Sequence, residues 1–174
     1  TTVKVKVARY IFWFLTVAIM AGIFLASSQE AEVSSALSQS FIRTTLKLVV
    51  ENFETLSEQQ KFEIVDSLHT FVRKSAHFFI YLSLGACMFS ALCTYGIKWA
   101  VRFLIGFPSC VIYSVSDEYH QTFVEGRSGN LADILLDSAG ALVGILIVFI
   151  CVLIWQECRT KGKKMRKKGL MKKL

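Results

Sequence analysis

The sequence carries a dense run of ionisable and amide side chains between Asp117 and Asp133, with an apolar stretch on either side. A charged side chain at membrane depth costs roughly 2.5 to 3.5 kcal/mol on insertion scales, so such residues normally face one another, water or a ligand. Carboxylates suit general acid or base chemistry. The carboxylates expected to act in this way are Glu118, its neighbour Asp117, and Asp133. The run is therefore a candidate site.

A second polar group precedes the apolar stretch that starts at residue 75. Arg73, His77 and Tyr81 recur every four residues and therefore share one face of a helix, with Lys74 on its flank. An unpaired imidazole inside an apolar stretch is costly, so His77 needs a partner. The two cations suit a clamp for an anionic head group, with His77 as a proton partner. Their plainer interpretation is interfacial anchoring.

The obvious partners of this group lie at the end of the apolar stretch before Asp117. Asp117 and Gln121 are four residues apart, and Glu118 and Gln121 are three apart, so helical spacing puts them on one side. His120 falls on a different arc. In a purely structural interpretation, Glu118 is the counterion of Arg73 or Lys74.

The segment 125–130 has the glycine and polar density of a tight turn. Asp133 and Asp137 then begin the next apolar stretch one helical turn apart, where a carboxylate complements the helix dipole. In a purely structural interpretation, Asp133 interacts with the helix dipole and Arg127 forms a salt bridge with Asp133. In a binding interpretation, Arg127 joins the cationic clamp. The residues expected to contact the substrate are Asp137, Gln121, Tyr81 and Gln29.

The elements that must position these residues are membrane helices. The chain has 174 residues, of which 53% are hydrophobic and one is proline, a composition unlike that of an ordinary soluble domain. A helix needs about 20 apolar residues to cross the membrane. The sequence predicts an all-α, polytopic membrane bundle, a single domain of residues 1–156, with four spans at 10–29, 75–97, 99–116 and 134–156. A signal peptide is the alternative for the first span, and the lack of a clear cleavage site disfavours it.

The segment 30–74 between the first two spans is predicted to be helical and amphipathic. Ser34 is expected to cap its first helix. The sequence Ser57 to Gln60 has the spacing of a capping box that starts a second helix, which is predicted to run directly into the second span. This outer segment would lie in the membrane interface, form a lid over the site, or serve as a packing element.

Basic residues predict the orientation, since they favour the cytoplasmic side of a membrane. The N-terminus, the connection near Lys98 and the basic tail at 157–174 all fall on one side of a four-span bundle. We therefore expect a multi-pass protein of the cell membrane with both termini in the cytoplasm and the site on the extracytoplasmic face. The net charge of +7 is then a topology signal rather than a nucleic-acid footprint.

Three stretches of sequence resemble the VanZ-like family: SSQ at Ser27 to Gln29, RKSAHFFIYLSLG from Arg73, and SDEYHQTFVEGRSGNLADILLDSAGALVG from Ser116. The resemblance covers residues 22–144. It implies a small helical envelope protein, in a family whose named member is associated with teicoplanin resistance, a glycopeptide resistance of Gram-positive bacteria. The family's motif residues correspond here to the following positions: Gln29, Lys74, His77, Asp117, Glu118, Gln121, Arg127, Asp133 and Asp137.

Two classes of function remain open. In the first, the protein is an enzyme that modifies an envelope lipid or a lipid-linked cell-wall precursor at the outer leaflet. Glu118 or Asp117 acts as acid or base, and Arg73, Lys74 and Arg127 hold a phosphate or pyrophosphate. In the second, the protein binds such an anionic head group without turnover. A buried structural lock between helices is the plainest option.

A divalent metal is a variant of the enzyme hypothesis. Asp117, Glu118, Asp133 and His77 would hold it, and the hard oxygen ligands favour Mg²⁺ or Mn²⁺ over zinc. The five cysteines show no Cys-x-x-Cys spacing, so they predict neither a zinc site nor a disulfide framework.

Overall fold

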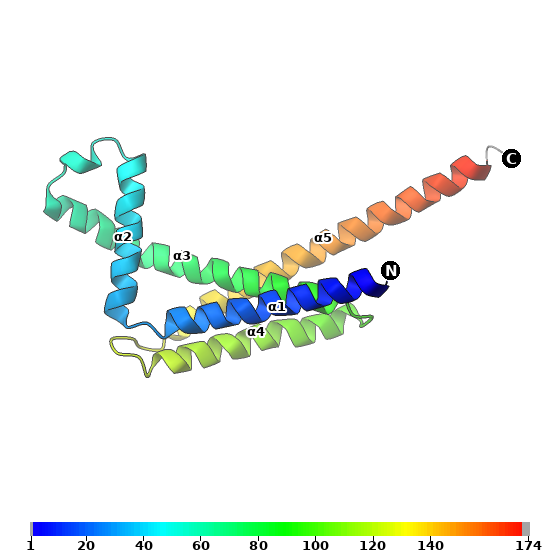
Figure 1. Ribbon diagram of the computed structural model, residues 1–174, viewed down its shortest axis with the longest axis horizontal. Helices are drawn as coiled ribbons and strands as arrows, with labels where there is room; N and C mark the ends of the chain where they lie inside the picture. Colours follow the sequence, from blue (N-terminus) through cyan, green and yellow to red (C-terminus); the bar gives the residue numbers. More distant parts are fainter. Residues whose placement is uncertain (1, 172–174) are drawn as a thin grey trace.

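The computed structural model describes residues 2–171 and is built entirely from helices (Figure 1). Along the chain these are as follows: α1 (Thr2–Ser27), α2 (Ala31–Val49), the short 3₁₀ helix η1 (Phe53–Thr55), α3 (Glu58–Cys93), α4 (Trp99–Gln121) and α5 (Leu131–Met171). No strand occurs within residues 2–171. Helices α1, α3, α4 and α5 are long and apolar enough to cross a membrane. The predicted all-α bundle with four spans is confirmed.

Helix α3 joins the outer segment to the second span without a break, as predicted. Its 36 residues correspond to about 54 Å at 1.5 Å per residue, well beyond the thickness of the hydrocarbon layer. The predicted capping box starts it: the Ser57 hydroxyl accepts from the Gln60 amide at 3.3 Å, and the Gln60 side chain accepts from the Ser57 amide at 3.1 Å. The helix can therefore carry Arg73 and His77 on a rigid element that extends out of the bundle.

The prediction that Ser34 caps the outer helix is wrong. Helix α2 begins at Ala31, so Ser34 lies inside it, and Glu30 occupies the N-cap position without a side-chain capping bond. Glu32 lies in the first turn, where its negative charge complements the helix dipole. Alanine and glutamate are also good helix formers, which allows the helix to start earlier than a serine cap would.

Several helix ends differ from the predicted span boundaries, three of them at the turns between α3, α4 and α5. Helix α3 ends at Cys93, ahead of the predicted residue 97, and α4 continues past residue 116 to Gln121. Asp117 and Glu118 are buried in this extra turn, because they face the bundle and not the lipid. Helix α5 starts at Leu131, three residues earlier than predicted, after Asn130, whose side-chain oxygen accepts from the Ala132 amide at 3.0 Å. Both shifts add polar residues to the helix ends that form the site.

Helices α3 and α5 form the closest contact of the bundle. A Cβ atom added at Gly85 would strike the Ala141 carbonyl, and one added at Gly144 would strike the Leu82 carbonyl. The buried side chains nearby include Tyr81 and Leu84. The backbones approach this closely because glycine has no side chain, a device that membrane helices use in place of the hydrophobic effect. It fixes α3 against α5 just below the candidate site.

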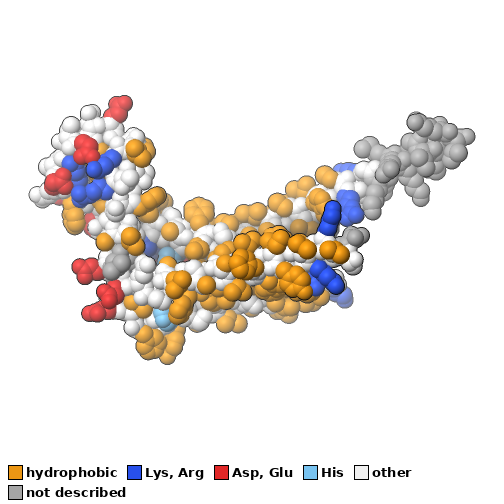
Figure 2. All heavy atoms as spheres, in the orientation of Figure 1, with side chains coloured by type: hydrophobic (Ala, Val, Ile, Leu, Met, Phe, Trp, Pro, Cys, Tyr) orange, Lys and Arg blue, Asp and Glu red, His pale blue; other side chains and the backbone are white. Residues whose placement is uncertain are grey.

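The two ends of the bundle differ in their charged side chains. Figure 2 shows Lys and Arg side chains near the end where both termini lie, acidic side chains together with a cluster of Lys and Arg at the other end, and hydrophobic side chains along the flank between them. Arg9 stacks on the Tyr95 ring at 3.8 Å, and Arg102 donates to the Tyr95 carbonyl at 3.0 Å. The turn after α3 therefore gathers basic residues of α1 and α4, as the four-span topology requires.

Candidate functional site

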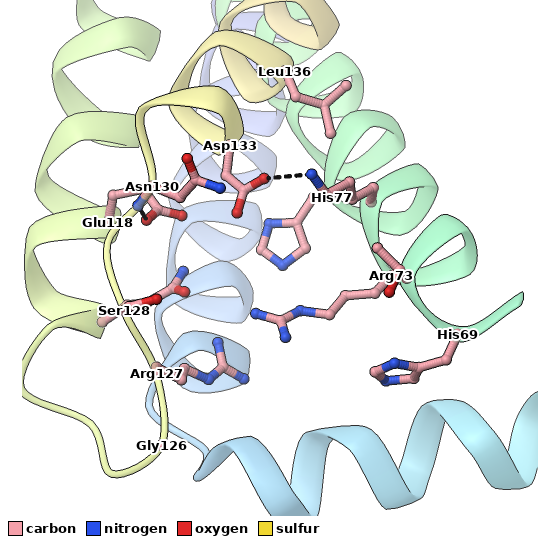
Figure 3. A pocket seen from close by; sticks show the side chains of 13 residues that line it. His69, Arg73, His77, Glu118, Gly126, Arg127, Ser128, Asn130, Asp133 and Leu136 are labelled. Atoms are coloured by element: carbon pink, nitrogen blue, oxygen red, sulfur yellow. Dashed lines mark hydrogen bonds and ion pairs between the residues drawn. The ribbon is translucent and has the colours of Figure 1, made fainter. Parts of the chain in front are cut away.

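A pocket of about 210 Å³ opens at the end of the bundle opposite the termini (Figure 3). Its walls come from α3, the end of α4, the α4–α5 loop and the first turns of α5. The lining residues are these: His69, Thr70, Arg73, Lys74, His77, Glu118, Gln121, Gly126, Arg127, Ser128, Asn130, Asp133 and Leu136. The structure thus brings together seven of the eleven residues that the sequence predicts for the site.

Two guanidinium groups give the pocket its main electrostatic feature. Arg73 of α3 and Arg127 of the α4–α5 loop point toward one another across it (Figure 3). Arg127 donates to the Ala26 carbonyl at 3.3 Å, and in the described part of the chain neither arginine forms an ion pair with a carboxylate. Burial, and then the charge of Arg73, lower the pKa of Arg127 from its usual value, although arginine stays protonated. Two guanidinium groups without a carboxylate ion-pair partner have the charge and the donors that suit an anion.

Lys74 differs from the arginines because its charge is already neutralised. Its ammonium group lies 3.3 Å from an Asp133 carboxylate oxygen, and this ion pair joins α3 to the first turn of α5. The sequence left open whether Arg127 would pair with Asp133 and whether Glu118 would pair with Lys74. In the structure, Asp133 forms its ion pair with Lys74. The pair holds the two helices together at the pocket rim.

His77 lines the pocket in front of a buried carboxylate. Its Nδ1 lies 3.7 Å from Oδ1 of Asp137, which is within ion-pair distance but too long for a hydrogen bond. Asp137 is fully buried, and its second oxygen accepts from the Ser114 hydroxyl at 3.4 Å. The imidazole is 26% exposed. The Asp137 carboxylate of α5 thus lies directly behind an imidazole of α3 that is accessible from the pocket.

Glu118 closes the opposite wall and fixes the α4–α5 loop. Its Oε2 accepts from the Asn130 amide at 2.8 Å. Gly129 lies so close that an added Cβ would meet the Thr122 side chain at 2.9 Å. The second carboxylate oxygen of Glu118 is left for a ligand or a proton.

Asp117 lies beneath the pocket and does not line it. Its Oδ2 accepts from the Ser27 hydroxyl at 3.0 Å and from the Gln121 side-chain amide at 3.2 Å. The predicted sharing of one side by Asp117 and Gln121 is therefore observed, and it ties α1 to α4. Tyr81 is fully buried one turn below His77, and Gln29 is exposed outside the pocket.

Several pocket residues escaped the sequence reasoning. His69 is one helical turn before Arg73, so the four-residue spacing of Arg73 and His77 was a signal that could have found it. Asn130 is a favoured N-cap type directly before an apolar helix, which was a second usable signal. Thr70, Ser128 and Leu136 have no such signal, because their place depends on how the loop folds against α3.

The residues named for a divalent metal do not fit one. Asp117 is bonded to Ser27 and Gln121, Asp133 to Lys74, and Glu118 to the Asn130 amide. Within residues 2–171, no cluster of three or more histidine, cysteine or acidic side chains is arranged to hold a metal ion.

Comparison with protein families decides what kind of protein this is. The model of the VanZ/LLP1 family matches residues 12–153, most of the chain. The chain belongs to the VanZ/LLP1 family. No curated protein and no solved structure matches it. The VanZ/LLP1 match runs from α1 into α5, so it includes every wall of the pocket. It ends before the basic tail at 157–174, which also lies outside the resemblance over residues 22–144.

Proposed function

We propose that this VanZ/LLP1 membrane protein binds the phosphate or pyrophosphate of an envelope lipid or lipid-linked cell-wall precursor and acts on it as an enzyme. The observation that carries the proposal is the pair of guanidinium groups of Arg73 and Arg127, which face one another without carboxylate partners. A guanidinium offers a planar fork of donors that matches phosphate oxygens. Two forks can hold several oxygens of one phosphate group and spread its charge.

The groups beside the arginines supply the proton chemistry. His77 accepts the proton of an attacking water or hydroxyl, and Asp137 behind it stabilises the resulting imidazolium. The attacking oxygen forms a bond to phosphorus, and the bond from phosphorus to the leaving oxygen breaks. Glu118, in its protonated form, gives its own proton to that leaving oxygen from the opposite wall. The arginines stabilise charge on the phosphoryl oxygens during transfer. Each proton taken up by His77 is thus balanced by one released from Glu118.

The distribution of charge supports an extracytoplasmic site. Basic residues gather at the end of the bundle where the termini lie, and the pocket is at the other end (Figure 2). Because basic residues favour the cytoplasmic side, the pocket would face the outer leaflet of a multi-pass protein of the cell membrane. A lipid-linked precursor exposed there is a substrate of the right charge and location.

The proposal is tested by replacing His77 with glutamine. Envelope lipids and lipid-linked precursors are profiled by mass spectrometry in a Gram-positive host that makes wild type or His77→Gln at matched abundance. We expect one lipid species to be produced or consumed in cells that make wild type and to stay unchanged in cells that make His77→Gln. Removing a general acid or base should lower the rate of its conversion by roughly 100-fold to 10,000-fold.

His120→Gln is the matched control. His120 packs on Phe24 with ring centroids 4.6 Å apart and does not line the pocket, so this variant should give the wild-type profile. Identical profiles for wild type and His77→Gln would contradict an enzymatic role.

A non-catalytic binder is the second candidate, and the bond from the Asn130 amide to Glu118 favours it, since that bond gives Glu118 a structural task. The two candidates differ in whether a change in teicoplanin susceptibility requires turnover of a lipid. If wild type and His77→Gln change teicoplanin susceptibility equally while the lipid profile stays constant, the protein acts by binding its ligand.

A further inference from the structure

Helix α2 has two apolar faces, and one of them is left uncovered. Ile42 is buried and Leu46 partly buried in a small outer core formed with η1 and α3. Leu37, Phe41 and Leu48 are spaced by four and seven residues, so they form a stripe along a different side of the helix. Their exposures are 59%, 65% and 83%. This stripe of Leu37, Phe41 and Leu48 is referred to below as the apolar stripe.

Ion pairs on a third side fix the rotation of α2 about its own axis. Lys47 lies 2.8 Å from Glu54, and Arg43 lies 3.4 Å from Glu58. Lys61 is almost buried and reaches both glutamates, at 3.7 and 2.8 Å. The outer core and this network hold α2 against η1 and the start of α3. The apolar stripe is therefore held in one direction and does not turn inward.

The location of α2 identifies what lies in that direction. Helix α1 ends at Ser27 and α2 begins at Ala31, so three linking residues, spanning at most about 10 Å, separate the end of a membrane span from α2. Helix α2 then runs nearly at right angles to α1 and α4 and extends sideways beyond them (Figure 1). A helix in this position lies along the plane of the membrane at its surface.

We propose that α2 lies in the membrane interface at the pocket end of the protein, with the apolar stripe in contact with lipid acyl chains. Lipid is the occupant because the short linker after the first span keeps α2 at the membrane surface. Among the three roles that the sequence left open for the outer segment, this selects the interfacial one. It does not depend on the chemistry proposed for the pocket.

The consequence for the site is geometric. Helix α2 runs past the mouth of the pocket, close to the loop that carries Arg127 (Figure 3). An interfacial α2 places that mouth at the level of the lipid head groups. A phosphate attached to a lipid then reaches the arginines without leaving the membrane.

The test uses the photoreactive residue p-benzoyl-phenylalanine in place of Phe41, and separately in place of Leu48, in the full-length protein. Each variant is reconstituted into vesicles of phosphatidylglycerol and phosphatidylethanolamine, irradiated and analysed by intact mass. We expect a protein–lipid adduct from both positions. The same residue in place of Lys47, on the ion-paired side, is the control and should give several-fold less adduct.

A protein–protein crosslink from positions 41 and 48 would overturn the proposal, since it would mean that a second copy of the chain covers the stripe. Equal adduct yields at positions 41, 47 and 48 would overturn it as well. The three positions are exposed, so the variants should fold. The adduct is measured without any activity, so a negative lipid profile for the pocket leaves this result unaffected.

Discussion

Replacing Arg73 or Arg127 by glutamine is expected to weaken the binding of a phosphate-bearing lipid by roughly tenfold to a hundredfold, because a hydrogen bond to a charged group contributes about 1.5 to 3 kcal/mol. The double variant should show no binding above that of a neutral lipid. The reason is that each guanidinium lacks a carboxylate partner in the described structure, so its charge is free for the ligand. Lys74, already paired with Asp133 at 3.3 Å, should matter less.

Native mass spectrometry of the purified protein in detergent measures this directly, with polyprenyl phosphate as the probe and the neutral polyprenol as the reference lipid. Arg43→Gln is the matched control. It removes the same charge from an exposed arginine that pairs with Glu58 on the outer segment, and it should bind as wild type does. Equal polyprenyl phosphate binding by wild type and the double variant would exclude the arginines as the clamp.

The face of α3 that carries the site could be read from the sequence. Arg73 and His77 both line the pocket, and Tyr81 lies one turn deeper, as the four-residue spacing predicts. The bond from Gln121 to Asp117 follows from the same rule. Within one helix, periodicity fixes which side chains share a side, so this part of the site was predictable.

The pairing between helices could not be read in the same way. The sequence offered Arg127 for Asp133 and either cation for Glu118, whereas Asp133 pairs with Lys74 and Glu118 accepts from the Asn130 amide. Periodicity contains no information on how far one helix is shifted along another. That shift is set here by the glycine contacts of α3 and α5, in which backbone meets backbone.

Adjacent residues with similar chemistry were also indistinguishable. Asp117 and Glu118 are neighbours and both are carboxylates, but they point about 100° apart on a helix. One is bonded beneath the pocket to Ser27, and the other lines it. The third span was predicted to end at residue 116, before these two carboxylates, because a carboxylate that faces lipid is costly in a membrane. A carboxylate that faces the bundle costs far less, so the helix continues past them.

The glycine contacts lead to the second large effect. Gly144→Val is expected to prevent α3 and α5 from packing, because a Cβ at this position would collide with the Leu82 carbonyl and come too close to the Ala86 amide nitrogen. Backbone atoms cannot rotate away as a flexible side chain can. Overpacking typically costs about 1 to 3 kcal/mol, and a backbone collision should lie at the top of that range. We expect a clearly lower melting temperature in detergent and a lower yield of monodisperse protein.

Gly22→Val makes the same substitution where no atom lies within 4 Å of the added Cβ. Both glycines lie inside membrane-spanning helices, so a difference between the two variants reports the contact between helices and not the change from glycine to valine. Gly22→Val should have a melting temperature close to that of wild type. A melting temperature of Gly144→Val equal to that of Gly22→Val would show that α3 and α5 do not meet there. Asp137 lies two turns before Gly144 and faces His77 across the same two helices. Gly144→Ala carries the same Cβ without the two further methyl groups of valine, so it should also increase the separation of His77 and Asp137 and reduce turnover.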